Sequence, residues 1–253
     1  MSLKRMKIWA QVLHFYLLSF CGSKAMILDG DQTVEMLLKG KSLIRLGDGE
    51  FGIRHGYDIH YQKWSLRLKE AFDTISNDYF SDGDCRYLLA VPRKFFKCSG
   101  FKLLKKREYI SSWARARWDF SKMYPQKDCV YGDAFLFHKG NSEVYQRIWT
   151  ENSRKKIFFV HNDCKYAENF EKSYSIEALE FVRCPQENAF SSIEEIENKI
   201  INIAGDLMWD PKEVLILVSA GPAGKVIVFD LSKIGYQCID TGHCWDDPLD
   251  ELR

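Results

Sequence analysis

The sequence predicts an α/β fold built around a mostly parallel sheet with helices on both faces. The first observation is that short β-rich runs alternate with amphipathic segments after residue 30, which is the pattern of βα units. The second is that glycine-containing loops directly follow several of these runs. No linker, repeat or low-complexity segment interrupts residues 31–253. We therefore expect one domain over 31–253, preceded by an N-terminal extension over residues 1–30.

Short runs of apolar and β-branched residues mark the strands, and segments with apolar residues at helical spacing mark the helices. The expected strands lie at residues 42–46, 86–91, 129–137, 156–160, 178–183, 213–220 and 236–240. The expected helices lie at residues 31–38, 63–77, 102–122, 142–151, 191–208 and 222–234. The last two have the strongest local support. Ser191 or Ser192 can cap the first of them, and Pro222 suits the first turn of the second.

The N-terminal extension combines a basic start with an apolar stretch. Lys4, Arg5 and Lys7 precede the apolar residues 8–21, which are not followed by a signal-peptide cleavage site. This stretch is shorter than the roughly 20 apolar residues that cross a bilayer. We expect an amphipathic helix, for which two positions stay open. It either packs on the domain or lies in a membrane interface with its basic end towards the lipid head groups.

The overall composition excludes a protein governed by a global charge. With 36 Lys plus Arg against 35 Asp plus Glu, the formal net charge is +1, so no nucleic-acid partner is expected and any anion site must be local. The eight cysteines form no CxxC pair, which argues against a zinc or redox motif and favours small buried side chains in a reducing cytoplasm. They are Cys21, Cys85, Cys98, Cys129, Cys164, Cys184, Cys238 and Cys244. We expect a cytoplasmic protein, with any peripheral contact at the inner face of the membrane.

Four loops of unusual composition follow expected strands. They cover residues 47–56, 184–190, 219–225 and 240–247. In an open parallel sheet the carboxyl ends of the strands share one edge, and ligands bind in the crevice outside it. The loops therefore predict one site.

The first of these loops begins in the stretch RLGDGEF, which places Asp48 and Glu50 among glycines. In an extended backbone, residues two apart point the same way, so both carboxylates would face one side. Paired carboxylates suit Mg²⁺ or Mn²⁺ bound together with substrate phosphates, and Gly47 and Gly49 allow a close approach to a ligand. The alternative is a solvated acidic turn. In such a loop neither acid is expected to contribute much to stability.

The segment SAGPAGK, residues 219–225, opens the last expected helix. It is not a Walker loop, because Ser219 stands in place of the first Gly and Val226 follows Lys225 where Ser or Thr is required. A short Gly-Pro loop at a helix start can still bind phosphate through free N–H groups and the helix dipole. A tight turn with Pro222 in the first helical position explains the same residues without a ligand.

The histidines are mostly uninformative when each is taken alone. His243 differs in context, because it follows Gly242 in the last loop, at the same end of the sheet as Asp48 and Glu50. It is a candidate third metal ligand or a phosphate contact.

Three stretches together resemble one known family. They are RLGDGEF (45–51), RCPQENAF (183–190) and SAGPAGKVIVFDLSKIGYQCIDTGH (219–243). In order and spacing they are similar to the GT-D-type glycosyltransferases, which were long catalogued as a domain of unknown function. The resemblance covers roughly residues 40–245 and is most specific in the C-terminal stretch.

The resemblance implies a Rossmann-like domain of the GT-D variant. It implies transfer of a sugar from a nucleotide-sugar donor, typically a UDP-sugar, to a saccharide hydroxyl in glycan or polysaccharide biosynthesis. The acids Asp48 and Glu50 would then hold a divalent metal, Mn²⁺ or Mg²⁺, and the donor diphosphate. The residues expected to bind the donor are Arg45, Gly47, Gly49, Asn162, Asn188, Gly221, Pro222 and Lys225.

Two segments depart from the family pattern. Where the family has Gly-x-Gly-Asn-Asp, this chain has Val160-His161-Asn162-Asp163 and keeps only the Asn-Asp pair. Where relatives have a segment with Ser-Arg, it has Gly132-Asp133-Ala134-Phe135. The identity of the sugar therefore does not transfer by analogy.

If the reaction inverts the anomeric centre, a carboxylate must take the proton of the acceptor hydroxyl. Asp133 and Asp163 are the candidates for this base, and each can equally cap a turn. Two other functions fit the residues. One is a metal-dependent phosphohydrolase acting on a nucleotide or sugar phosphate, which would need more carboxylates than can be placed here. The other is a non-catalytic nucleotide-sugar-binding protein, consistent with 14% aromatic residues.

Overall fold

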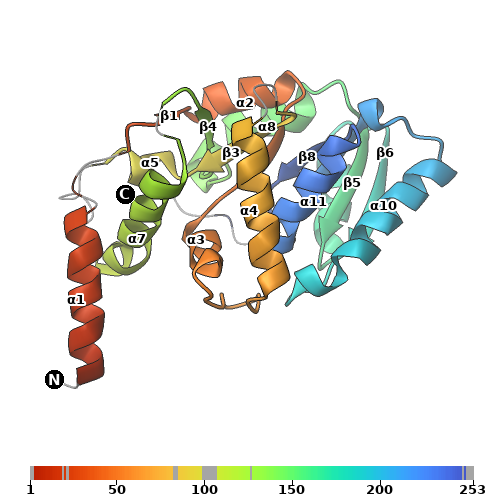
Figure 1. Ribbon diagram of the computed structural model, residues 1–253. Coiled ribbons are helices and arrows are strands. Elements are labelled where there is room, and N and C mark those ends of the chain that lie inside the picture. Colours follow the sequence, from red (N-terminus) through yellow and green to blue (C-terminus); the bar gives the residue numbers. More distant parts are fainter. Residues whose placement is uncertain are drawn as a thin grey trace.

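The chain folds around a single eight-stranded sheet in which the strand pairs are parallel (Figure 1). The computed structural model describes residues 3–18, 20, 23–81, 85–98, 107–125, 127–246 and 248. The strands are β1 (Met26–Ile27), β2 (Ser42–Arg45), β3 (Tyr87–Val91), β4 (Val130–Asp133), β5 (Lys156–His161), β6 (Ala178–Arg183), β7 (Val214–Val218) and β8 (Gln237–Asp240). Their spatial order is β1-β4-β3-β2-β8-β7-β5-β6. The predicted α/β fold with a parallel sheet is confirmed.

Helices cover both faces of the sheet, as predicted. They are α1 (Leu3–Leu18), α2 (Gly30–Leu38), α3 (Asp48–Arg54), α4 (Leu66–Ser81), α5 (Arg93–Phe96), α7 (Arg107–Met123), α8 (Ser142–Thr150), α9 (Lys165–Ser173), α10 (Ile193–Asp206) and α11 (Gly221–Lys233). Short 3₁₀ segments lie at Lys139–Asn141, Ala189–Ser192 and Pro211–Glu213. One apolar cluster lies under α4, α7, α10 and α11 and includes Phe72 and Phe120. A second lies under α2, α8 and α9 and includes Trp149 and Phe170.

The strand order places β2 beside β8 in the middle of the sheet, with Leu43 paired to Ile239. From β2 the chain builds outward through β3 and β4, then crosses to the other side of β2, where β5, β6 and β7 lie and the last strand, β8, pairs with β2. This arrangement creates a switch in the direction of winding, which in open α/β sheets is where ligands bind. The loops after β2, β7 and β8 consequently meet.

Several elements differ from the sequence-based expectation. The strand expected at 129–137 ends at Asp133, and residues 134–137 form a turn. Strand β1 and helix α9 were not expected, because β1 has two residues and α9 buries only Ala167 and Phe170. Residues 102–106 of one expected helix, and Cys21, lie outside the described residues. The described cysteines are all free.

The RLGDGEF stretch is the main correction, because it forms the start of helix α3 and not an extended loop. Gly47 is the N-cap residue, and the Glu50 carboxylate accepts a hydrogen bond from the Gly47 N–H at 2.7 Å. Phe51 and Ile53 are buried in the core and anchor the helix from below. Residues two apart on an α-helix lie about 200° apart around its axis. Asp48 and Glu50 therefore face different sides.

Helix α1 extends away from the body of the domain and packs along α7 (Figure 1). Tyr16 is buried, and the guanidinium of Arg115 on α7 lies 5.5 Å from the centre of the Phe15 ring. The opposite face of α1 is exposed. Among the helices of the described chain, none combines the length and hydrophobicity that a bilayer-spanning segment requires.

Candidate active site

A cleft of about 840 Å³ opens at the carboxyl edge of the sheet. This volume is in the range of small-molecule sites. The predicted residues that line it are Arg45, Gly47, Asp48, Gly49, Glu50, Asn162, Gly221, Pro222, Lys225 and His243. The structure thus brings together residues from three separate stretches of the sequence. This follows from the parallel sheet, whose strands all end at the same edge.

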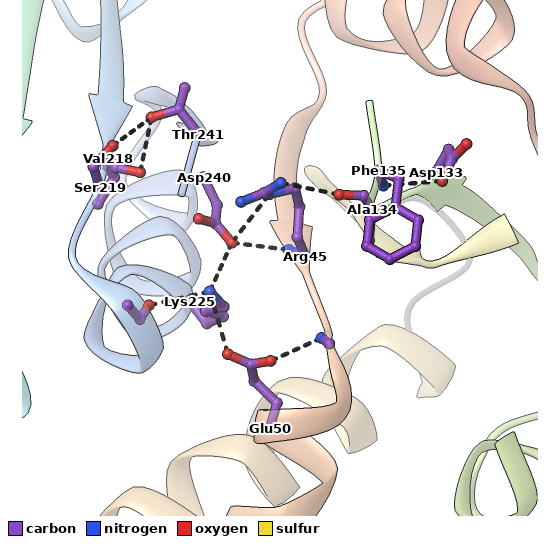
Figure 2. Close-up of polar contacts among 12 residues, drawn as sticks. Arg45, Glu50, Asp133, Ala134, Phe135, Val218, Ser219, Lys225, Asp240 and Thr241 are labelled. Carbon is purple, nitrogen blue, oxygen red and sulfur yellow. Dashed lines mark hydrogen bonds and ion pairs between the residues drawn. The ribbon is translucent and has the colours of Figure 1, made fainter. Parts of the chain in front are cut away.

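A buried chain of alternating charges forms the floor of the cleft (Figure 2). The Asp240 carboxylate, fully buried at the end of β8, lies 3.1 Å from the Lys225 ammonium and 3.7 Å from Arg45 Nε. Lys225 also lies 3.3 Å from Glu50 Oε1. Asp240 was not predicted as a site residue. Its signal was present in the Ile-Asp-x-Gly-His ending of the C-terminal stretch, which the family resemblance already singled out.

Lys225 is held in its charged form by this network. Burial alone would lower its pKa, but the carboxylates of Asp240 and Glu50 outweigh burial and raise the pKa above its ordinary value. A lysine ammonium has three N–H donors. Three acceptors surround it here: Asp240, Glu50 and the Gly221 carbonyl oxygen at 3.1 Å. Lys225 thereby links the start of α11 to Asp240 on β8 and to Glu50 on α3.

Two helix N-termini border the cleft. Helix α11 starts at Gly221 and α3 starts at Asp48, and both of these residues line the cleft. The first N–H groups of a helix lack intrahelical partners, and the helix dipole adds partial positive charge there. This end of the cleft suits a diphosphate.

Two glycines are required by the geometry of the cleft. Gly221 has φ +54°, and a Cβ there would lie 2.7 Å from the Tyr61 ring. Gly242 has φ +53°, and a Cβ there would lie 1.8 Å from Arg45 Nη2. Both positions combine a left-handed backbone with close packing, so a side chain would displace a cleft residue.

The histidines of the cleft occupy different environments. His243 Nδ1 lies 3.2 Å from Asp246 Oδ1, and its ring meets the Tyr61 ring edge-on at 6.1 Å. Burial lowers the pKa of His161. Its Nδ1 accepts a hydrogen bond from the Asp163 N–H at 3.1 Å. His161 is therefore neutral at neutral pH, with its proton on Nε2.

Three predicted site residues lie outside the lining of the cleft. Asn188 holds the loop that carries Tyr61, because its Oδ1 accepts from Lys63 N at 2.8 Å. The Asp133 carboxylate accepts from the backbone N–H groups of Phe135 and Arg93. The Asp163 carboxylate accepts from Lys165 N and pairs with the Lys165 ammonium at 3.0 Å. Neither aspartate faces the cleft, so their role as a catalytic base remains a prediction.

The three metal ligands expected from the sequence, Asp48, Glu50 and His243, do not form a group that could hold one ion. Within the described part of the chain, no group of three or more His, Cys, Asp or Glu side chains is arranged to hold an ion. Both oxygens of Glu50 are already engaged, by Gly47 N and by Lys225. Asp48 lines the cleft at the start of α3. Its Oδ1 accepts a hydrogen bond from the Gly49 N–H at 3.1 Å. Mg²⁺ and Mn²⁺ are commonly held by one or two carboxylates plus substrate phosphates, and Asp48 is compatible with the role of one such carboxylate.

Two solved structures share this fold. One, described as a new glycosyltransferase (DUF1792) from Streptococcus sanguinis, superposes with a TM-score of 0.69 at 21% identity, covering 87% of this chain and 82% of that one. Another is described as showing that the highly conserved domain of unknown function 1792 has a distinct glycosyltransferase fold. It has a TM-score of 0.65 at 24% identity, covering 91% of this chain and 81% of the other. At these identities the likeness establishes the fold.

The sequence profile of the glycosyltransferase GT-D fold family matches residues 43–247. The chain therefore belongs to the GT-D-fold glycosyltransferase family. Glycosyltransferase GlyD of Streptococcus pneumoniae serotype 4 is 27% identical over 237 residues, covering 84% of this chain and 26% of GlyD. The probable glycosyl transferase Gly of Streptococcus gordonii is 27% identical over 229 residues, covering 86% of this chain and 32% of Gly. This chain thus spans about a quarter to a third of the length of these relatives.

Proposed function

We propose that this protein is a metal-dependent glycosyltransferase that moves a sugar from a UDP-sugar to a saccharide acceptor in glycan or polysaccharide biosynthesis. The observation that carries this proposal is the convergence of the N-terminus of α11, the Arg45 guanidinium and the Asp48 carboxylate on one cleft, in a chain of the GT-D family. Such a cleft suits a diphosphate leaving group.

In this proposal the donor diphosphate lies in the part of the cleft lined by the start of α11 at Gly221 and by the start of α3 at Asp48. Arg45 is the arginine in the described lining of the cleft, and its Nη1 is fixed by a hydrogen bond to the Ala134 carbonyl oxygen at 2.9 Å. A fixed cation stabilises charge that develops on a leaving group without reorganising. Lys225 positions these elements through Asp240 and Glu50.

Asp48 would hold the divalent ion together with the donor phosphates. When bound, such an ion supplies Lewis-acid neutralisation of the negative charge on the departing UDP. His243 is a second candidate ligand from the sequence. It is more than half exposed and already lies beside Asp246, so we assign the ion primarily to Asp48.

We also propose that α1 lies on the inner face of the membrane. Its exposed apolar side chains recur on one face of the helix: Leu3, Met6, Trp9, Leu13 and Leu17. The chain has no acidic residue before Asp29, whereas Lys4, Arg5 and Lys7 lie at its start. This combination is typical of helices that lie in the interface of anionic bilayers.

Vesicle sedimentation tests this membrane contact. Replacing Leu13 and Leu17 by Asp should weaken binding to phosphatidylglycerol vesicles by at least about tenfold, since two buried apolar side chains are lost. Ile234→Asp, at a residue 54% exposed on another surface, is the matched control. Equal binding of wild type and the double variant would contradict the proposal.

The central test is release of UDP from a set of UDP-sugars, with saccharide acceptors, in Mn²⁺ and in chelator. We expect UDP to raise the melting temperature more with Mn²⁺ than with chelator, because ligands that bind only the native state stabilise it. Equal stabilisation in both conditions would remove the metal from the proposal. A phosphohydrolase would instead release phosphate or nucleotide at a rate independent of acceptor, and a binding protein would show no turnover.

A further inference from the structure

The cleft has a second end that is aromatic and uncharged. Its lining there consists of Pro92, Phe95, Trp113, Ala134 and Phe135. These residues come from three separate segments: the turn and helix α5 after β3, helix α7, and the turn after β4.

Three rings of this end form one rigid surface. Phe95 and Trp113 stack with centroids 4.5 Å apart and planes 14° apart. Phe135 meets both rings edge-on, at 5.4 Å and 5.5 Å. Phe95 is 6% exposed and supports the others from the core, whereas Trp113 and Phe135 are half-buried and line the cleft. We call these three residues the aromatic wall.

The aromatic wall lies beyond the donor end of the cleft. Its residues Phe95 and Phe135 follow β3 and β4, which lie one and two strand spacings from β2, where α3 begins, and three and four from β7, where α11 begins. At about 4.8 Å per spacing the separation is roughly 5 to 10 Å from the α3 side and 14 to 19 Å from the α11 side of the donor end. Figure 2 shows Arg45 between the two ends, with Lys225 on one side and Phe135 on the other. A ligand on the wall would face the sugar of a donor whose diphosphate lies at α11.

The aromatic wall contributes aromatic rings to the cleft but few polar groups that could form hydrogen bonds with the edge of a nucleobase. The Ala134 N–H donates to the Val91 carbonyl oxygen at 3.1 Å, and the Ala134 carbonyl oxygen accepts from Arg45 at 2.9 Å. The Ala134 N–H is therefore not available to a nucleobase, and its carbonyl oxygen already accepts one hydrogen bond. The apolar C–H face of a pyranose ring needs only a flat aromatic surface and contributes through area and dispersion.

We infer that the aromatic wall is the acceptor subsite, and that one pyranose ring of the acceptor stacks on Trp113 beside Phe135. This inference rests on the proposed function, because it takes the opposite end of the cleft to be the donor end. It assigns acceptor recognition to residues 92–95, 113 and 134–135. The last pair lies in a segment where this chain departs from the family pattern, and the others lie outside the three family stretches.

Saturation-transfer NMR tests the inference directly. The probes are methyl β-D-glucopyranoside, methyl β-D-galactopyranoside and N,N′-diacetylchitobiose, each with UDP and Mn²⁺ present. We expect transfer from aromatic protons of the wild-type protein to the C–H face of at least one sugar. Trp113→Ala should weaken that sugar's affinity by about tenfold, which corresponds to about 1.4 kcal/mol, and Trp113→Phe should restore part of it.

The matched control is Trp118→Ala on the same helix, where the ring lies under the Lys122 ammonium at 4.6 Å and outside the cleft lining. It should leave sugar binding unchanged. The Kd of UDP should change less than about twofold in Trp113→Ala, and Phe135→Leu provides a second variant if Trp113→Ala unfolds.

Four outcomes overturn the inference. They are no saturation transfer to any probe from the wild type, unchanged sugar affinity in both wall variants, equal losses in Trp113→Ala and Trp118→Ala, and a loss of UDP affinity as large as the loss of sugar affinity. The last outcome would assign the wall to the nucleobase. Failure of the wild type to bind UDP would instead overturn the proposed function.

Discussion

Two groups of carboxylates contact helix α11, and their neighbours differ. Glu50 and Asp240 lie on either side of the Lys225 ammonium, with Arg45 next to Asp240. Glu197 on α10 lies beside Asp230, five residues further along α11 than Lys225, where its close partner is another acid. In the first group the acids raise the pKa of a buried lysine despite its burial. In the second, burial and then Asp230 raise the pKa of Glu197 to about 7.

This comparison shows that the same residue type is ionised or protonated according to its partners. Acids that neutralise fixed cations hold the cleft floor together. Acids that meet each other keep a proton near neutral pH and make that part of the surface sensitive to pH.

The largest expected effect comes from removing the cation of the first group. Lys225→Met keeps the length of the side chain but leaves buried Glu50 and Asp240 without their shared partner. Breaking a buried ion pair in this way costs about 3 to 5 kcal/mol of unfolding free energy, measurable by denaturant titration. Lys233→Met is the matched control, because Lys233 pairs with Asp78 at the surface and should cost less than about 1 kcal/mol. A loss in Lys225→Met no larger than in the control would show that the network is not structural.

The second prediction separates the two acids of RLGDGEF. Asp48→Asn should lower sugar transfer by about 10²-fold, roughly 2.7 kcal/mol in the transition state, because the amide loses the charge that holds the ion. Its unfolding free energy should change by less than about 1 kcal/mol, the size of a helix N-terminal charge effect. Asp31→Asn, in the first turn of α2, is the control for that helix effect.

Glu50→Gln should behave differently from Asp48→Asn. The expectation of an exposed, dispensable acid is corrected by the burial of Glu50 and its contact with Lys225. We expect a loss of stability of about 1 to 3 kcal/mol. If Asp48→Asn destabilises the protein as much as Glu50→Gln does, the assignment of Asp48 to the ion and of Glu50 to the structural network is wrong.

The third prediction concerns Gly242, whose backbone places Arg45 beside Asp240. Gly242→Ala should cost about 1 to 2 kcal/mol for the left-handed backbone, and it should weaken UDP binding because Arg45 Nη2 must move. Gly205→Ala in α10 is the control, since a Cβ there meets no atom within 4 Å. That substitution should be neutral or stabilising. Unchanged UDP affinity in Gly242→Ala would show that Arg45 does not contribute to donor binding.

The smallest expected effect is the pH dependence of the second group. Because the folded-state pKa of Glu197, about 7, is above its ordinary value of 4.5, the folded protein binds the proton more tightly. The contribution of Glu197 to stability is then fully present below pH 4.5 and is lost as the pH rises through about 7. The unfolding free energy should change by less than about 1.4 kcal/mol per pH unit. The partial exposure of Glu197 reduces this change further.

Melting temperatures across this pH range check the slope. Glu197→Gln should flatten the curve, whereas Glu195→Gln, at an exposed position of the same helix, should not. The other charged groups that face the pair are Glu194, Arg67 and Lys233. An identical curve in wild type and Glu197→Gln would assign the pH dependence to those groups.

The sequence by itself determined the parallel α/β fold and the edge at which the site lies. Alternating periodicities define βα units, and parallel strands necessarily end at one edge, so the loops that begin at Gly47, Ser219 and Thr241 had to meet. The family motifs also indicated the Gly-Pro start of α11 and the histidine after β8.

Only the tertiary structure decided which of the two acids of RLGDGEF joins the buried charge network. The contact between Arg45 and Asp240 joins residues 195 positions apart, and no local pattern encodes such a pair. Whether Glu50 is free or engaged depends on Lys225, which lies on a different helix. The aromatic wall likewise depends on where α5, α7 and the turn after β4 come together. Burial and charge pairing arise between segments that are distant in sequence, so they are decided when the segments pack.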